Sequence, residues 1–357
     1  MPYRVGVVGA GLYGSRVLRA FYSCHKAGTI VLSAIADVNP AAVRDAVDNY
    51  AVVGYSDYKE MVEKENLDAV AVVTPDSLHE EIAIYCAERK LHLFIQKPLD
   101  VTIEGSQRIV DAANRNNVLL FVDFHKRFDP SLILLKNKIR DGKLGEILYG
   151  YANIEDIIAY PSKHFVKWAH QSSPMWFIGI HFLDVFNWMF GEAPKKVMAH
   201  GAKKKLLGMG IDTYDSIQAK LLYANGASMT LDASWILPDL FPSGVNQNVR
   251  VVGTEGLMEI DGQHRGVESW STVELGGRVD NPYGYLESEN PLTGCGLSGY
   301  TIDTMLHFPQ ILAKLEKGVT LESLAGTYAD GPQAVLATRV AFAVHKSADS
   351  GGAEILV

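Results

Sequence analysis

Residues 5–14, Val5-Gly6-Val7-Val8-Gly9-Ala10-Gly11-Leu12-Tyr13-Gly14, decide the fold of this chain. An apolar run enters a G-x-G-x-x-G turn, and an amphipathic stretch over 12–27 follows it. In such a strand–turn–helix unit the first glycine makes a tight turn and the second lets a pyrophosphate approach the backbone. The third glycine lets the helix pack closely on the strand. The stretch therefore predicts a dinucleotide-binding site.

Further apolar runs continue this pattern up to about residue 123. They alternate with amphipathic stretches, as in βαβ units around a parallel sheet. A helix is expected from Pro40, with Asn39 as its N-cap. The expected strands are Tyr3–Val8, Ile30–Ala36, Ala69–Val73, Leu91–Ile95 and Val118–Val122.

Asp37 stands at the end of the second expected strand. A carboxylate at this place accepts hydrogen bonds from ribose hydroxyls and repels a 2′-phosphate, so NAD is expected rather than NADP. The alternative interpretation is that Asp37 only caps the helix at Pro40. The two roles are compatible.

The pattern changes after residue 123, where strand-like segments show a period of two. Residues 217–221 and 228–233 flank Asn225-Gly226, a strong hairpin signal. We therefore predict an α/β Rossmann domain over 1–123 and an α+β domain over 124–357 with a large, mostly antiparallel, open-faced sheet. Residues 280–299 are expected to form one long loop, and the final helix could pack back on the first domain.

Composition excludes several classes of protein. The chain has 357 residues, which favours two domains, and a net charge of −8, which argues against nucleic acid or a membrane surface as a partner. Its three cysteines, Cys24, Cys86 and Cys295, are far apart and show no disulfide or zinc pattern. With no leader-like or membrane-spanning stretch, we expect a cytoplasmic protein.

Two side chains are candidates for the chemistry because of their positions in the expected strands and helices. Lys97 belongs to Gln96-Lys97-Pro98, which follows an expected strand at the edge where open α/β sheets bind ligands, and its ammonium could stabilise negative charge on a substrate oxygen. Residues 177–190 are predicted to form a helix with His181 and Asp184 on one side. Histidine suits proton transfer near neutrality, although a packed histidine satisfied by Asp184 is the alternative. No third residue at suitable spacing suggests a metal site.

Over nearly its whole length the chain resembles the Gfo/Idh/MocA oxidoreductases. The resemblance rests on motifs in a specific order: Gly9–Gly14, Thr74-Pro75-x-x-x-His79, Gln96-Lys97-Pro98, Gly179-x-His181-x-x-Asp184, Gly253-Thr254-Glu255-Gly256 and Ser347-x-x-x-Gly351. It implies an NAD-dependent oxidoreductase that interconverts a secondary alcohol and a ketone on a sugar, a sugar derivative or an inositol-like cyclitol. It also implies a homodimer or homotetramer formed through the open sheet.

The resemblance also implies site residues. Lys97 and His181 match the family's catalytic positions. We expect the cofactor at Gly9, Gly11, Leu12, Tyr13, Gly14, Asp37, Thr74, Pro75, His79, Gln96, Lys97 and Pro98. We expect the substrate at Arg127, Trp176, His181, Asp184 and Trp235, because aromatic faces and polar groups suit a polyhydroxylated ring. Arg127 could instead pair with Asp129.

Two positions depart from the family pattern. Phe177 stands where many members carry an aspartate, and Gln96 replaces the glutamate of the tripeptide. Two alternatives stay open, and these changes support the second of them. One is an enzyme that retains NAD(H) and works through a keto intermediate without releasing the cofactor, and the other is a catalytically silent NAD and sugar sensor of the same fold.

Overall fold

The computed structural model describes residues 1–271, 276–287 and 296–357. The chain divides into two compact units. The first unit comprises residues 1–125 and 301–335, and the second comprises residues 126–300 and 336–357. No helix in the described parts of the chain is long and apolar enough to cross a membrane.

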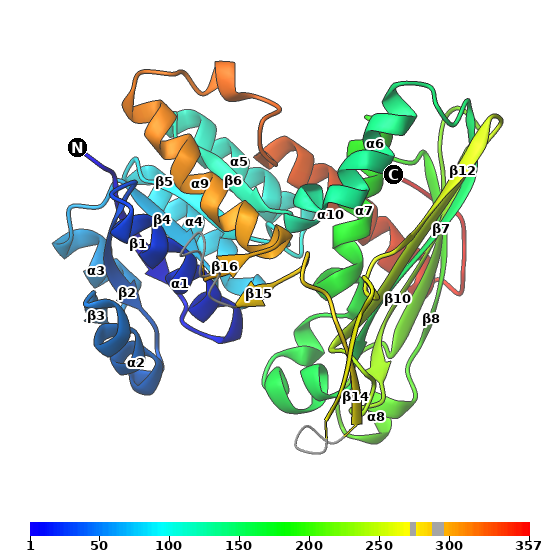
Figure 1. The fold of residues 1–357 in the computed structure, drawn as a ribbon, viewed down its shortest axis with the longest axis horizontal. Helices are drawn as coiled ribbons and strands as arrows, with labels where there is room; N and C mark the ends of the chain where they lie inside the picture. The colour runs from blue at the N-terminus through cyan, green and yellow to red at the C-terminus, as the bar shows by residue number, and fades with distance from the viewer. Residues whose placement is uncertain (272–275, 288–295) are drawn as a thin grey trace. The chain divides into compact units, whose positions relative to one another are not determined.

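The first unit contains a six-stranded parallel sheet with the order β3-β2-β1-β4-β5-β6 (Figure 1). The five predicted strands are confirmed, within a few residues at their ends. A sixth strand, β3, was missed because it has only three residues at the edge of the sheet, directly after a helix. The strands are β1 Arg4–Val8, β2 Val31–Ala36, β3 Val53–Tyr55, β4 Ala69–Val72, β5 His92–Gln96 and β6 Leu120–Asp123.

Helices between the strands cover this sheet. The predicted start of α2 is confirmed: Pro40 occupies its first turn, and the Asn39 side chain accepts a hydrogen bond from the Ala41 N–H. The helices of the first unit are α1 Leu12–Lys26, α2 Pro40–Tyr50, α3 Tyr58–Lys64, α4 His79–Glu88, α5 Ile103–Asn116 and α9 Tyr300–Glu316, with short 3₁₀ turns η1 Asp76–Leu78 and η6 Glu322–Leu324. The 3₁₀ turn η2 His125–Phe128 and the first residue of α9 lie at the boundary of the units.

The division into units differs from the sequence prediction in one respect. Residues 301–335, which the prediction placed in the second domain, belong to the first unit. The reason is aromatic packing: the ring of Phe308 on α9 lies 5.5 to 6.0 Å from the rings of Phe21, Phe94 and Phe121. All four rings are fully buried, so α9 completes the core on that face of the sheet.

The second unit contains a seven-stranded sheet with the order β12-β11-β7-β10-β9-β8-β17. The pairing is antiparallel except between β7 and β10, so the prediction of a mostly antiparallel sheet is confirmed. The predicted hairpin is β9–β10, and Leu222 pairs with Ser228 across its turn. The strands are β7 Ile147–Ile157, β8 Lys196–Ala202, β9 Ser216–Leu222, β10 Ser228–Leu237, β11 Val245–Gly253, β12 Gly256–Asp261 and β17 Ile355–Leu356.

Helices and small strand pairs complete the second unit. The helix predicted over 177–190 begins instead with a π-helical turn, η5, and continues as α7. The predicted loop over 280–299 holds a short strand pair, and its residues 288–295, including Cys295, lie outside the described residues. The elements are α6 Pro130–Arg140, η3 Tyr160–His164, η4 Ala169–Gln171, η5 Met175–Gly179, α7 Ile180–Phe190, α8 Lys205–Gly208, β13 Val267–Ser271, β14 Gly276–Asp280, β15 Leu286–Glu287, β16 Leu297–Ser298 and α10 Gly331–Asp349, the last of which spans the boundary of the units.

Candidate functional site

The glycine turn between β1 and α1 has the geometry that the sequence predicts. Gly9 has a φ of +99°, and a Cβ there would lie 2.5 Å from the Val73 carbonyl oxygen. A Cβ on Gly14 would lie 2.2 Å from the Gly9 carbonyl oxygen. A Cβ on Gly11, in contrast, would meet nothing within 4 Å. The turn is therefore closed on its inner side and open at Gly11, where a phosphate group can approach the backbone.

Asp37 follows β2 and braces this turn. One carboxylate oxygen accepts a hydrogen bond from the Ala10 N–H at 2.6 Å, and the other accepts from the Asn39 N–H at 2.7 Å. The residue is partly exposed. Its oxygens keep further lone pairs, so the same carboxylate that holds the turn remains available for a ribose hydroxyl.

The loops after β4 and β5 are joined by a buried histidine. The Nδ1 of His79 lies 2.8 Å from the Pro98 carbonyl oxygen, and its Nε2 lies 3.0 Å from the Thr74 carbonyl oxygen. His79 is fully buried, and its ring bridges the two segments through these two contacts. This placement makes His79 a support for the predicted cofactor-binding segments.

Lys97 lies at the carboxyl end of β5 and is only 6% exposed. Its peptide bond to Pro98 is cis, and its N–H donates a hydrogen bond of 2.6 Å to the Gln96 side-chain oxygen. The lysine is therefore placed at the sheet edge that binds ligands in open α/β folds, as predicted.

Asp123 is a residue of this edge that the sequence interpretation missed. It ends β6, pairs in register with Gln96 of β5 and is fully buried. Its Oδ2 accepts hydrogen bonds from the Tyr13 hydroxyl at 2.6 Å and from the Gln96 amide at 3.2 Å. The available signal was an acid that ends an apolar strand, the same signal that singled out Asp37.

The candidate residues of the second unit centre on α7. His181 is 4% exposed, and Asp184 one turn later is fully buried. The Arg127 guanidinium binds Asp184 in a bidentate manner, with Nε–Oδ2 at 2.8 Å and a terminal nitrogen–Oδ1 at 2.5 Å. The alternative partner for Arg127, Asp129, instead binds Arg265 at 2.8 Å. Arg127 thus connects the segment after β6 to α7.

The two candidate tryptophans lie in packed surroundings. Trp176 is 8% exposed, and its ring stacks on His345 with centroids 4.9 Å apart. Trp235 is fully buried and donates its indole N–H to the Tyr214 carbonyl oxygen at 2.6 Å. The assignment of Trp235 as a direct substrate contact therefore has no support in this placement, because its ring is covered by the core that also packs Phe177.

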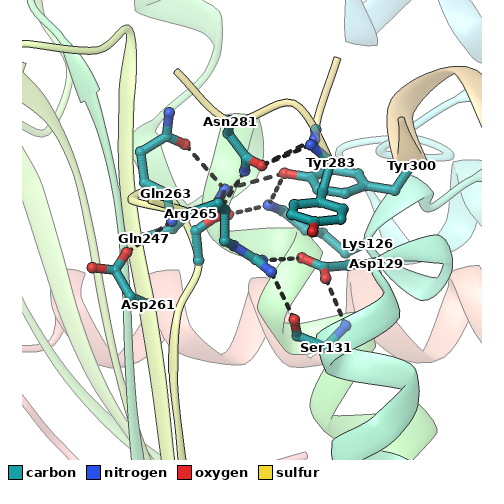
Figure 2. A network of polar contacts seen from close by, with 12 residues as sticks. Lys126, Asp129, Ser131, Gln247, Asp261, Gln263, Arg265, Asn281, Tyr283 and Tyr300 are labelled. Atoms are coloured by element: carbon teal, nitrogen blue, oxygen red, sulfur yellow. Dashed lines mark hydrogen bonds and ion pairs between the residues drawn. The ribbon is translucent and has the colours of Figure 1, made fainter. Parts of the chain in front are cut away.

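A second polar network, which sequence reasoning also missed, surrounds Lys126 (Figure 2). Its ammonium donates to the Gln247 side-chain oxygen and, at 3.0 Å, to the Tyr300 hydroxyl. In the same view Arg265 reaches Asp129 and Ser131 at the start of α6. These residues are far apart in the sequence, and no local pattern could have grouped them. Among the described residues, no cluster of three or more acidic, histidine or cysteine side chains could hold a metal ion.

Comparison with known proteins settles the family. Residues 3–124 match the model of an oxidoreductase family with an NAD-binding Rossmann fold, named GFO/IDH/MocA, and residues 133–259 match the C-terminal domain of the same family. The chain belongs to the GFO/IDH/MocA oxidoreductases. The resemblance inferred from sequence is confirmed, and the first unit is an NAD-binding domain.

Other members of this family are similar over much of the chain. A myo-inositol 2-dehydrogenase of Thermotoga maritima is 27% identical over 262 residues, which cover 72% of this chain and 75% of the relative. A scyllo-inositol 2-dehydrogenase (NAD(+)) of Bacillus subtilis is 30% identical over 204 residues, which cover 56% and 57% of the two chains. The crystal structure of a myo-inositol 2-dehydrogenase from Lactobacillus plantarum shares the fold over all of both chains, with a TM-score of 0.81 at 20% identity.

The glycine turn gives a matched pair of test variants. Gly14→Ala should lower both NAD affinity and the free energy of unfolding, the latter by about 1–3 kcal/mol, because its Cβ would collide with backbone. Gly11→Ala should leave stability nearly unchanged and weaken NAD binding about tenfold or more, since its Cβ fills only the open side of the turn. Denaturant unfolding and calorimetric titration with NAD measure the two effects. Wild-type NAD affinity in Gly11→Ala would contradict this account.

Proposed function

We propose that this member of the family is an NAD-dependent dehydrogenase that interconverts a secondary alcohol and a ketone on a cyclitol or sugar. The observation that carries the proposal is Lys97, buried at the ligand-binding edge of an NAD-binding sheet. The named activities of the inositol dehydrogenases it resembles support the substrate class. Gly11 leaves open the approach that a pyrophosphate needs, and Asp37 favours the ribose of NAD over a 2′-phosphate.

Two side chains of this chain would carry the proton and charge chemistry. The Lys97 ammonium would bind the carbinol oxygen and stabilise the negative charge that develops there. The His181 imidazole would take the hydroxyl proton and return it in the reverse direction. NAD, when bound, supplies the hydride acceptor. Arg127 and Asp184 would act by fixing α7, which carries His181, and Trp176 would contribute to the wall beside it.

The test is turnover by the purified protein with NAD or NADP. The panel contains myo-inositol, scyllo-inositol, hexoses, pentoses and sugar acids, and NADH formation is followed by its ultraviolet absorbance. Reduction of NAD by at least one cyclitol or sugar is expected. Silence across the panel, with NAD still binding in calorimetry, would contradict the dehydrogenase and favour the sensor. NAD(H) that stays bound through purification would favour the enzyme that retains its cofactor.

Assembly and location are part of the same proposal. We propose a homodimer or homotetramer in the cytoplasm. The large side chains exposed on β7 and β12, Leu148, Tyr149, Tyr151 and Leu257, support an interface on the second sheet. Cys24 and Cys86 are free thiols buried in the first unit, which suits a reducing compartment.

A further inference from the structure

Asp123 is a buried acid in the first unit that the proposed chemistry does not yet use. Burying a carboxylate is costly unless hydrogen bonds and a nearby cation compensate it. Two donors converge on its Oδ2, the Tyr13 hydroxyl and the Gln96 amide. The positive charge of Lys97 also favours its charged form. The cation that compensates Asp123 is therefore the lysine to which we assign the carbinol oxygen.

Gln96 connects the acid to the lysine through its two amide ends. Its Nε2 donates to Asp123, and its Oε1 accepts the N–H of Lys97 at 2.6 Å. An amide held at both ends has one orientation, so the position of Asp123 fixes the backbone from which the Lys97 side chain departs. The register of β5 and β6 makes this possible because it sets Gln96 directly opposite Asp123.

We propose that Asp123 is a positioning residue for Lys97: its negative charge offsets the buried ammonium, and its contact with Gln96 holds the lysine segment in place. The proposal rests on the proposed function in one point only, namely that Lys97 binds a substrate. Tyr13 holds the Asp123 carboxylate in place through the hydrogen bond that its hydroxyl donates. Burial and then the Asp123 charge raise the pKa of Tyr13 well above its ordinary value, so its hydroxyl keeps the proton that it donates.

The charge on Asp123 can be switched by pH within a range that the protein should tolerate. Burial raises the pKa of this carboxyl to about 6, against the opposing effects of the Tyr13 hydrogen bond, Thr304 and Lys97. The titratable groups that face it are Tyr13 from α1, Lys97 after β5 and, beyond the Tyr13 hydroxyl at 3.5 Å, His125 from η2. Asp123 is therefore charged well above pH 6 and neutral well below it.

The kinetic test compares the wild type with Asp123→Asn across pH. At about pH 8 the turnover number of the variant should be roughly tenfold lower, because the charge beside Lys97 is gone. At about pH 5 residue 123 is neutral in both proteins, so the ratio of their turnover numbers should approach one. Taking the ratio removes every pH dependence that both proteins share. A ratio that stays constant with pH would indicate a merely structural role and overturn the proposal.

Asp215→Asn is a matched control, because Asp215 is a buried acid of the second unit that accepts hydrogen bonds from three backbone N–H groups. Its ratio to the wild type should not vary with pH across the same range.

A double-mutant cycle in stability tests the charge pairing without any substrate. The effect of Asp123→Asn on the folding equilibrium constant is measured with Lys97 present and in Lys97→Met. At about pH 8 the effect should be about tenfold more unfavourable when Lys97 is present, and at about pH 5 the difference should vanish. Additive effects at both pH values would overturn the pairing. If the cycle shows coupling while the substrate panel is silent, the proposed function fails and the pairing stands.

Discussion

Lys97→Met should lower the turnover number about a thousandfold, with a far smaller change in NAD affinity. Lys97 is buried at the end of β5. We therefore expect no cation or water molecule from the solvent to take the place of its ammonium at the carbinol oxygen. Methionine keeps the length and most of the volume of the side chain, and its substitution removes little beyond the charge and its hydrogen bonds. Steady-state kinetics with the best substrate of the panel and calorimetric titration with NAD measure the two quantities.

An exposed lysine of the same unit provides the control. Lys64 ends α3, forms an i,i+4 pair with Glu60 and has 63% of its side chain exposed, so Lys64→Met should leave turnover unchanged. A Lys97→Met enzyme that retained turnover within about threefold of the wild type would refute the role assigned to the lysine. Loss of turnover in both variants would point to a general effect on the protein instead.

The local signals in the sequence were sufficient for most of the first unit. Apolar runs, a glycine turn and a Pro40 helix start depend on neighbours in the chain, and the structure confirms all three. Strand β3 was missed because three residues at a sheet edge, directly after a helix, are too few to show a strand periodicity. The place of α9 could not be predicted either, because Phe308 joins the core only through rings more than 180 residues away in the chain.

The residues of the candidate site also fall into two groups, those with a local signal in the sequence and those without one. Lys97, His181 and the glycines were found because motifs and strand ends mark them. Asp123 could not be predicted as a site residue, because only the register of β5 and β6 sets it opposite Gln96. Lys126 could not be predicted either, because its partners Gln247 and Tyr300 have no sequence spacing that connects them to it. Aromatic composition leaves two interpretations of Trp235, because tryptophan suits a core as well as a binding wall, and its full burial favours the core.

Asp184→Ala should lower the free energy of unfolding by about 3–5 kcal/mol, because it takes the carboxylate away from the buried Arg127 guanidinium. The side chains of Arg127 and Asp184 are 9% and 1% exposed, and their contact is bidentate. Replacing the pair by Arg127→Met with Asp184→Leu should recover most of that loss, since two apolar groups need no compensation. Denaturant unfolding followed by circular dichroism gives the three values.

The same double variant separates two roles of Arg127, the ion pair with Asp184 and the substrate contact that the sequence left open. If the ion pair only fixes α7, a variant with restored stability should keep the Michaelis constant for the substrate near that of the wild type. If Arg127 also binds a substrate hydroxyl, the Michaelis constant should rise about tenfold or more although stability has returned. A loss below about 1 kcal/mol in Asp184→Ala would contradict the structural role, because a buried charge deprived of its carboxylate costs more than that.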